Sequence, residues 1–277
     1  MHDSGILRAM KRKLSFFDGA SLCVAFLTVL FLTASLCTII IGGLPFLPGA
    51  FRSEEVLFSI RLSLVTSTIS TLLCFVVGIP CAYALARCRM PLRNLCRLVL
   101  ELPLSLPYLV LGLCLLMMFS SEAGRLLKTF GIRVIFEPAG IVMAQWIVNI
   151  PFVIRLMRTA LEELDGRLEF IAGTLGASPW QRFCTITLPL CRNSILMAAI
   201  LTWSRAIGEF GATLMLVGVT RMKTETLPAS IYLNISTGDN GMAMAAAIIL
   251  LIISGTALLA STLLQRRAAS RMEGACW

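Results

Sequence analysis

Histidine is almost absent from this sequence: among 277 residues, the single one is His2. Histidine is a frequent acid, base and metal ligand, and the sequence also lacks an H-E-x-x-H motif, a G-x-x-x-x-G-K-[ST] phosphate loop and a G-x-S-x-G turn. We therefore predict no catalytic residues, no cofactor-binding residues and no metal ligands. ATP hydrolysis, if it drives this protein, belongs to another chain.

Paired cysteines are also lacking. Ten cysteines are present, but none forms a C-x-x-C pair and none falls in a segment that we assign to the outside. Disulfides form in oxidising compartments, and structural metal sites need clustered ligands. We interpret these cysteines as small, buried apolar residues.

Charge is scarce. Charged residues make up 14% of the chain, against about a quarter in soluble domains. Hydrophobic residues make up 57% and fall in unbroken stretches long enough to cross a bilayer. The net charge is +9, but the basic residues stand between these stretches, without interleaved aromatic residues. The composition predicts an all-α integral membrane protein surrounded by lipid and argues against a nucleic-acid partner.

Six apolar stretches predict six transmembrane helices. They cover residues 20–44, 56–86, 98–119, 139–157, 195–219 and 242–264. The first stretch follows a basic N-terminus, but its length of about 25 residues exceeds the hydrophobic region of a signal peptide. We therefore expect it to be retained. Pro103 and Pro107 predict a kink in the third span.

Lysine and arginine are distributed unevenly between the two sides of these spans. Sixteen lie on the side that holds both termini, and seven lie on or near the other side. Because positive residues gather on the cytoplasmic side, we expect a multi-pass protein of the cell membrane with both termini in the cytoplasm. Residues 1–55 would then hold the N-terminal segment, first span and external linker, residues 56–264 the main membrane domain, and residues 265–277 a cytoplasmic tail.

One long internal loop, at about residues 162–190, joins spans four and five. Its apolar and small residues recur at helical spacing: Leu168, Ile171, Ala172, Leu175 and Gly176. Ser178-Pro179 is typical of the cap and first residue of a further helix. We expect two short helices on the cytoplasmic face, with a turn at Gly176. Leu188-Pro189 should then break the chain before span five.

The spacing within this loop resembles a known motif. From Gly176, nine residues lead to Ile186-Thr187-Leu188-Pro189. This resembles the EAA loop of permease subunits of binding-protein-dependent ABC importers, whose consensus reads EAA, three residues, Gly, nine residues, I-x-L-P. Aligned on Gly176, the consensus Glu falls at Phe170, and Glu169 stands one position earlier. The resemblance implies that the loop couples the chain to an ATPase through Glu169, Ala172, Leu175, Gly176, Ala177, Leu188 and Pro189.

The resemblance extends to S-R-A-I-G-E-F-G-A-T at 204–213 and T-E-T-L-P at 224–228. These stretches are similar to the molybdate, tungstate and sulfate permeases of that family, most of all to the molybdate and tungstate group. The implied fold is the six-span type I importer permease with cytoplasmic coupling helices. The implied partners are a second copy of the chain, two ABC ATPase subunits and an external solute-binding protein.

The cargo that this resemblance implies is a tetrahedral oxyanion, most of all molybdate or tungstate, with sulfate or another small solute as the alternative. Two other classes remain open from the residues alone. One is a secondary transporter driven by an ion gradient, and the other is an intramembrane enzyme, for which Arg205 and Glu209 supply few polar groups.

Arg205 and Glu209 stand four residues apart in the fifth span and would share one helix face. A charge in the middle of a span costs at least about 2.5–3.5 kcal/mol and normally finds a partner. The two residues predict either an ion pair that braces the span or, with Gly208 and Gly211, the lining or gate of a translocation pathway. We expect Gly112, Gly208 and Gly211 to permit close helix packing.

Overall fold

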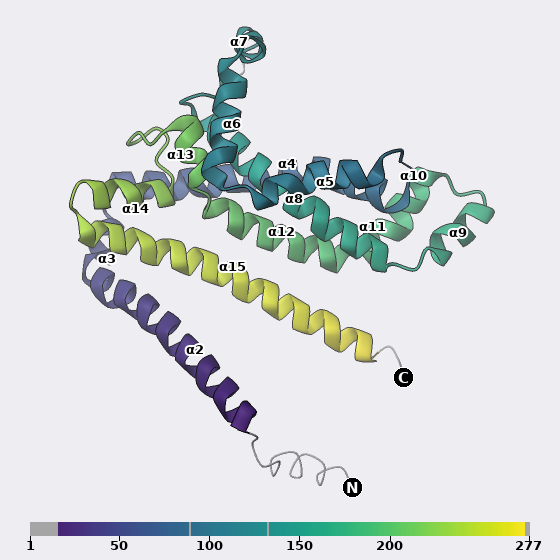
Figure 1. The fold of residues 1–277 in the computed structure, drawn as a ribbon, viewed down its shortest axis with the longest axis horizontal. Helices are drawn as coiled ribbons and strands as arrows, with labels where there is room; N and C mark the ends of the chain where they lie inside the picture. The colour runs from purple at the N-terminus through teal and green to yellow at the C-terminus, as the bar shows by residue number, and fades with distance from the viewer. Residues whose placement is uncertain (1–15, 89, 132, 275–277) are drawn as a thin grey trace.

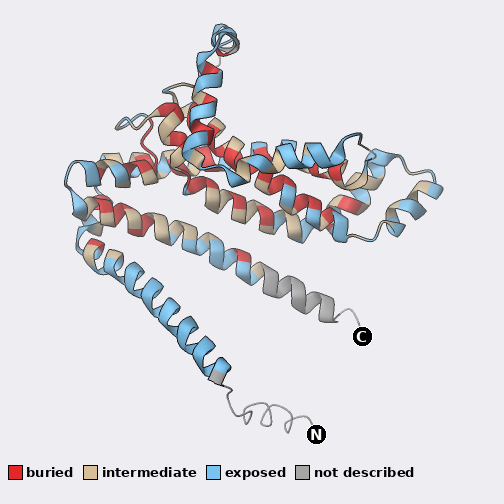
Figure 2. Ribbon diagram, in the orientation of Figure 1, coloured by how far each residue is buried: buried red, intermediate tan, exposed pale blue. Residues whose placement is uncertain are grey.

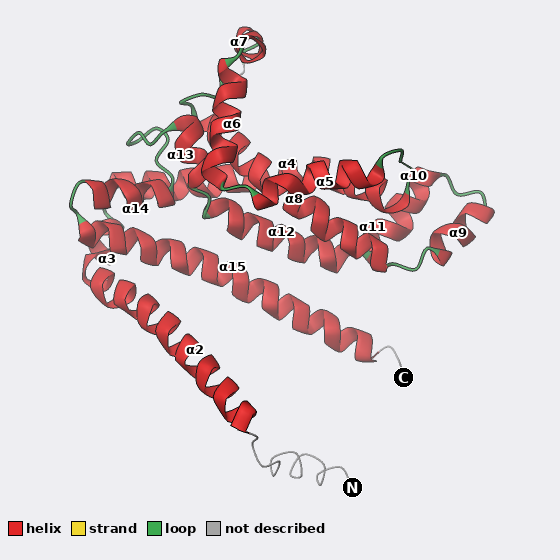
Figure 3. Ribbon diagram, viewed as in Figure 1, coloured by secondary structure: helices red, strands yellow, loops and turns green. Residues whose placement is uncertain are grey.

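The computed structural model describes residues 16–88, 90–131 and 133–274. Within these residues the regular elements are all helices, and none is a strand (Figure 3). Some residues used in the sequence analysis lie outside the described residues. They are the basic residues of the N-terminal segment (Arg8, Lys11, Arg12 and Lys13), Arg89, and residues 275–277 of the predicted tail.

Four helical segments are long and apolar enough to cross a bilayer alone. They are α2 (Phe16–Gly43), which continues through η1 (Leu44–Phe46) and α3 (Leu47–Ala50), then α4 (Glu54–Arg87), α8 (Pro138–Glu163) and α15 (Asn240–Gly274). Two bent helix pairs raise the number of candidate spans in the described residues to six. The predicted all-α membrane fold is confirmed, but two of the six spans are not single helices.

The third predicted span is broken rather than kinked. α5 (Arg93–Ser105) and α6 (Tyr108–Ser120) meet at 112°, and α6 projects away from the other long helices (Figure 1). Leu106, between them, is extended with φ −87° and ψ 143°. A residue that precedes proline avoids the helical region because of the proline ring, so Pro107 accounts for the break.

The fifth predicted span, residues 195–219, is broken once, and a further bend lies just before it. α12 (Arg192–Ile207) ends before Gly208, and α13 (Gly211–Val217) follows a short break. At its start, α12 bends by 70° from the segment formed by α10 (Pro179–Arg182), the π-helix η2 (Phe183–Thr187) and α11 (Leu188–Leu190). The bend falls at Cys191, so the break expected at Leu188-Pro189 is misplaced. Pro189 lies in the first turn of α11, where its missing N–H is not needed.

α4 and α8 pack along each other at the centre of the bundle, where the buried residues concentrate (Figure 2). The buried face of α4 carries small hydroxyl residues: Ser59, Ser63, Thr66, Ser67, Ser70 and Thr71. Several of them donate hydrogen bonds to carbonyl oxygens of their own helix. Small residues let two membrane helices approach closely, which explains why this contact tolerates hydroxyl groups.

The remaining helices mark the two ends of the bundle. α9 (Arg167–Thr174) and α10 lie at the end where α4 and α8 terminate (Figure 1). We name this the α9 end. α3 and α14 (Leu227–Ser236) lie at the opposite end, the α14 end. α7 (Glu122–Thr129) follows α6.

Candidate translocation pathway and coupling loop

The break between α12 and α13 forms one side of an open pocket of about 310 Å³. Its lining residues are Tyr108, Val148, Asn149, Ser204, Arg205, Gly208, Glu209, Phe210 and Gly211. The structure therefore brings together all four residues that the sequence suggested for a pathway. Tyr108, from the start of α6, and Asn149, from the middle of α8, join them there.

Neutral groups hold Arg205. Its Nη2 donates to the hydroxyl oxygen of Tyr108 at 2.6 Å, and its Nε donates to Oδ1 of Asn149 at 3.3 Å. The guanidinium carbon lies 4.6 Å from the ring centroid of Phe152, a cation–π contact. None of these partners carries a negative charge, so the positive charge of Arg205 is not neutralised by them.

Glu209 does not pair with Arg205. Both residues are described, and their side chains form no ion pair within 4.0 Å. Glu209 follows the end of α12, so the two residues do not share a helix face as the sequence suggested. Its side chain is buried, and Oε1 accepts a hydrogen bond from the backbone N–H of Ala212 at 2.8 Å. Glu209 thus satisfies a free N–H at the start of α13.

Gln145 stabilises the end of α12. Its Nε2 donates to the carbonyl oxygen of Ala206 at 2.9 Å and to Oγ1 of Thr66 at 3.4 Å. The Ala206 carbonyl also accepts from the backbone N–H of Glu209 at 3.2 Å, so Gln145 adds a second donor at this helix end. One turn later, Nδ2 of Asn149 donates to the Gln145 carbonyl at 2.8 Å. Sequence reasoning missed Tyr108, Gln145, Asn149 and Phe152, although two amides four residues apart in an apolar span are a readable signal.

The glycines near this pocket differ in purpose. A Cβ atom at Gly112 would lie 2.6 Å from the carbonyl oxygen of Ala212, and one at Gly211 would lie 3.3 Å from Cβ of Tyr108. Close packing of α6 against α13 therefore requires glycine at 112 and favours it at 211. At Gly208 the nearest atoms would be 3.8 Å away, so close packing does not explain this glycine, contrary to expectation.

The loop between α8 and α12 forms the predicted pair of short helices at the α9 end. α9 ends at a turn in which Gly176 has φ +89°, a conformation that glycine adopts without strain. Ser178 caps α10: its Oγ accepts from the N–H of Gln181 at 3.3 Å, and Oε1 of Gln181 accepts from the N–H of Ser178 at 2.8 Å. This reciprocal capping box confirms the predicted cap.

Large apolar side chains on this loop are exposed. The exposed fraction is 83% for Leu175, 72% for Phe170 and 71% for Trp180, and Ile171 is also exposed. We name Phe170, Ile171, Leu175 and Trp180 the coupling knob. Ala172 and Ala177 lie half-buried beneath it. Clustered apolar exposure is typical of a surface that contacts another protein or lipid.

Glu169 turns away from the coupling knob. Its Oε1 accepts a hydrogen bond from Oγ1 of Thr187 at 2.7 Å and lies 3.8 Å from Nε of Arg87. Nη2 of Arg87 donates to the carbonyl oxygens of Leu161 at 3.0 Å and Leu164 at 2.9 Å. Leu188 and Pro189 follow in α11.

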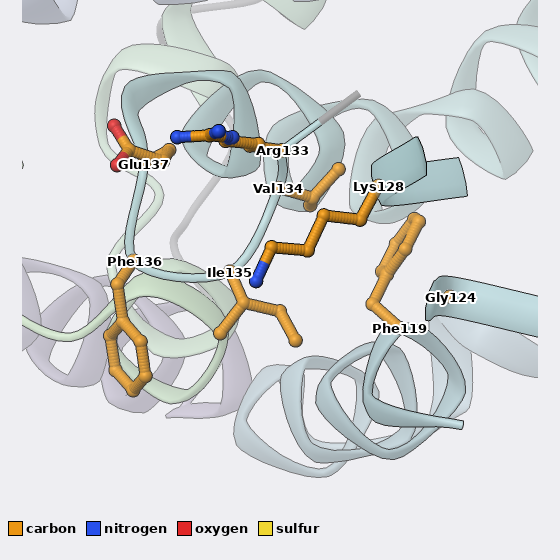
Figure 4. Close-up of a pocket in the computed structure, with 8 residues that line it drawn as sticks. All are labelled: Phe119, Gly124, Lys128, Arg133, Val134, Ile135, Phe136 and Glu137. Atoms are coloured by element: carbon orange, nitrogen blue, oxygen red, sulfur yellow. The ribbon is translucent and has the colours of Figure 1, made fainter. Parts of the chain in front are cut away.

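A second pocket, of about 320 Å³, lies between the end of α6, α7 and residues 133–137. Lys128 extends across it and Arg133 lies along its rim (Figure 4). Oε1 of Glu137 accepts from Nζ of Lys223 at 2.9 Å. Within the described residues, Lys128 and Arg133 form no ion pair, whereas Arg125 pairs with Glu122. We name this the α7 pocket.

Residues 74–272 match the family described as "Binding-protein-dependent transport system inner membrane component". The chain belongs to this family. The permease shares 39% identity over 190 residues with the molybdenum transport system permease protein ModB of Escherichia coli K12, covering 67% of this chain and 83% of that protein. It shares 33% identity over 224 residues with the sulfate transport system permease protein CysT of the same organism, covering 80% and 81%.

Solved ABC transporters share the fold of the permease. A chain of the bacterial alginate ABC transporter, in complex with an alginate-bound periplasmic protein, aligns with a TM-score of 0.73 and 16% identity, covering 90% of this chain and 93% of that one. A chain of the MetNI methionine ABC transporter aligns with a TM-score of 0.55 and 19% identity, covering 76% and 99%. The chain is a multi-pass permease subunit of an ABC importer with the type I fold, and a transport component rather than an enzyme.

Proposed function

We propose that this permease carries a tetrahedral oxyanion, molybdate or tungstate, along a path that passes Arg205. The observation that carries the proposal is the guanidinium of Arg205, held in an open pocket by Tyr108, Asn149 and Phe152 without an acidic partner. A guanidinium has five N–H donors, and the two hydrogen bonds leave donors for an oxyanion. The charge attracts an anion, and none of the hydrogen-bond partners of Arg205 is negative, although Glu209 lines the same pocket.

Glu209 limits how tightly this pocket holds the anion. It lines the same pocket, and its carboxylate is directed to the N–H of Ala212. A negative group near the path repels the cargo and opposes its capture by Arg205. We therefore assign Arg205, Gly208, Glu209 and Gly211 to a transit site or gate rather than a storage site.

The curated relatives support an oxyanion cargo. Proteins named for molybdenum transport and proteins named for sulfate transport match this chain at 33–39% identity. Molybdate, tungstate and sulfate have the same charge and tetrahedral shape. Sulfate is therefore the second candidate, and we propose that an external solute-binding protein makes most of the selection.

The coupling knob is the proposed seat of two cytoplasmic ABC ATPase subunits, one for each permease copy. Its exposed apolar side chains sit on a compact helix pair with a capped turn, which suits insertion into a groove. The start of α2 and the end of α15 both lie away from the α14 end (Figure 1), in keeping with both termini in the cytoplasm. Closure of the ATPases would draw two such loops together and open the opposite ends of the helices.

A homodimer is the proposed form of the membrane domain. α2 is mostly apolar, its most apolar stretch has no buried residue, and it diverges from the bundle (Figure 2). One face of α6 is likewise exposed and apolar at Leu109, Leu113 and Met117. These faces suit a second copy of the chain, with the pathway at the interface. The solute-binding protein would contact the side that carries the α7 pocket, away from the α9 end.

Reconstitution of the complex in proteoliposomes tests this function. With the ATPase and the solute-binding protein present, molybdate or tungstate should stimulate ATP hydrolysis and enter the vesicles, and sulfate should do so less. Stimulation by sulfate alone would support the second candidate. A chain that never associates with an ATPase, or one that transports without it after deletion of 175–177, would contradict the proposal in favour of an ion-gradient carrier.

A further inference from the structure

We infer that Glu169 is an internal strut, a positioning residue that ties α9 to the ends of α4 and α8 through Arg87 instead of contacting the ATPase. The inference rests on the coupling role proposed above for α9. It concerns how movement of the coupling knob reaches the membrane helices, and it assigns that step to three residues: Arg87, Glu169 and Thr187.

Burial separates Glu169 from the coupling knob. The exposed fraction of the side chain is 16% for Glu169 and 23% for Arg87, and Thr187 is buried. The next residue, Phe170, is 72% exposed. Neighbouring residues of an α-helix point about 100° apart, so α9 presents Phe170 outward at the position of the consensus Glu and directs Glu169 inward. Because Glu169 stands one position before the consensus Glu, its carboxylate faces inward, toward α4 and α8.

Arg87 joins three helices at one guanidinium. It is the last residue of α4, and its Nη2 donates to the carbonyls of Leu161, in the last turn of α8, and Leu164, which follows α8. Carbonyls at a helix end lack partners within the helix, and a cation is favourable there. Nε of the same group faces Oε1 of Glu169. The carboxylate of α9 is thus linked to both α4 and α8.

α9 has few other attachments. None of its residues is buried, so apolar packing holds it weakly. At its far side, a Cβ atom on Gly173 would lie 3.0 Å from Nη1 of Arg182, which places this second arginine against the helix. Because α9 lacks a buried apolar face, polar links carry a large share of any force between the coupling knob and the spans.

α8 continues this linkage to the pathway. The helix that ends near Arg87 also carries Asn149, which accepts a hydrogen bond from Arg205, and Gln145, which holds the end of α12. A displacement of α9 that moves α8 through Arg87 therefore moves two groups that position Arg205. Without the strut, α9 can move with the ATPase while α8 stays behind.

The test compares uptake of cargo per ATP hydrolysed in the reconstituted complex of wild type and Glu169→Gln. Gln keeps an acceptor for Thr187 but loses the charge that faces Arg87. We expect the variant to co-purify with the ATPase and to hydrolyse ATP, while uptake per ATP falls about fivefold or more. Thr187→Val should lower the same ratio, and Thr187→Ser, which retains the hydroxyl, should restore it.

Glu162→Gln is the matched control, because Glu162 pairs with Arg93 at 3.4 Å at the same end of the bundle without contacting α9. It should leave uptake per ATP unchanged. An unchanged ratio in Glu169→Gln would overturn the strut, as would loss of ATPase binding, the result expected for Leu175→Asp in the coupling knob. If Leu175→Asp still binds the ATPase, the coupling role of α9 itself is wrong, which separates the two failures.

Discussion

Arg205 illustrates, at the scale of single residues, how three neutral partners can hold a charged group inside a membrane domain. Tyr108 and Asn149 fix the orientation of the guanidinium through hydrogen bonds, and the Phe152 ring covers one face. None of the three neutralises the charge. These contacts fix the orientation of the guanidinium, and its positive charge can still attract an anion.

Substitutions at Arg205 and Tyr108 separate charge from orientation. Arg205→Met should abolish oxyanion uptake, whereas Arg205→Lys should retain part of it because the charge persists without the planar fork. Tyr108→Phe removes a hydrogen bond to a charged group, worth about 1.5–3 kcal/mol, and should raise the cargo concentration for half-maximal uptake. Tyr232→Phe, which keeps its ring contact with Phe210, is the control. Full transport by Arg205→Met would exclude Arg205 from the path.

The residues that line the pathway pocket were predictable from the sequence, but the contacts between them were not. Arg205, Gly208, Glu209 and Gly211 do line one pocket, because an intramembrane charge and clustered glycines are unusual enough to notice. The ion pair between Arg205 and Glu209, one of the two predicted alternatives, is wrong because the prediction assumed an unbroken helix. Tyr108 and Asn149 lie 97 and 56 residues from Arg205, and single-sequence patterns do not reveal which spans pack together.

Two predicted membrane spans are broken helices, and the sequence accounts for these breaks only in part. Pro103 and Pro107 predicted a disturbance in the third span, but the 112° angle depends on α6 packing against α13, which local sequence does not encode. The break at Gly208 has no proline. Two hydrogen bonds stabilise it: Gln145 of α8 donates to the Ala206 carbonyl, and Glu209 accepts from the Ala212 N–H. Only the first joins residues distant in the sequence and therefore requires the tertiary fold.

Gly112 provides a test of the contact between α6 and α13. In Gly112→Ala the new methyl group would lie 2.6 Å from a backbone oxygen, so one helix must shift. Such overpacking costs about 1–3 kcal/mol. We expect a lower midpoint of thermal unfolding and reduced uptake. Gly255→Ala in α15 adds a methyl group with no atom within 4 Å and should change neither. Equal midpoints for the two variants would contradict this packing.

Charge distribution matters at the scale of the whole molecule. Lys128 and Arg133 of the α7 pocket form no ion pair within the described residues, although the neighbouring Arg125 pairs with Glu122 and Lys223 pairs with Glu137. Unpaired surface cations attract acidic partners and accelerate their association. The two cations of the α7 pocket therefore suit the proposed contact with the solute-binding protein.

Charge reversal at the α7 pocket tests that contact. Lys128→Glu with Arg133→Glu should reduce stimulation of ATP hydrolysis by the loaded solute-binding protein, and the deficit should shrink with rising salt because screening weakens the repulsion. Hydrolysis without that protein should stay unchanged. Arg52→Glu with Arg61→Glu reverses the same number of charges at residues that do not line the pocket and serves as control. Equal stimulation in both double variants would place the contact elsewhere.

The exposed course of α2 has a kinetic consequence. Its last residue contacts α15, where a Cβ atom on Gly43 would lie 2.8 Å from the Met244 backbone, while the preceding helix diverges from its own bundle (Figure 1). If α2 packs against the second copy in the proposed homodimer, it must leave that contact through lipid before the two copies can separate. Subunits would then exchange very slowly in a lipid bilayer, and differently tagged homodimers brought into the same vesicles should remain unmixed.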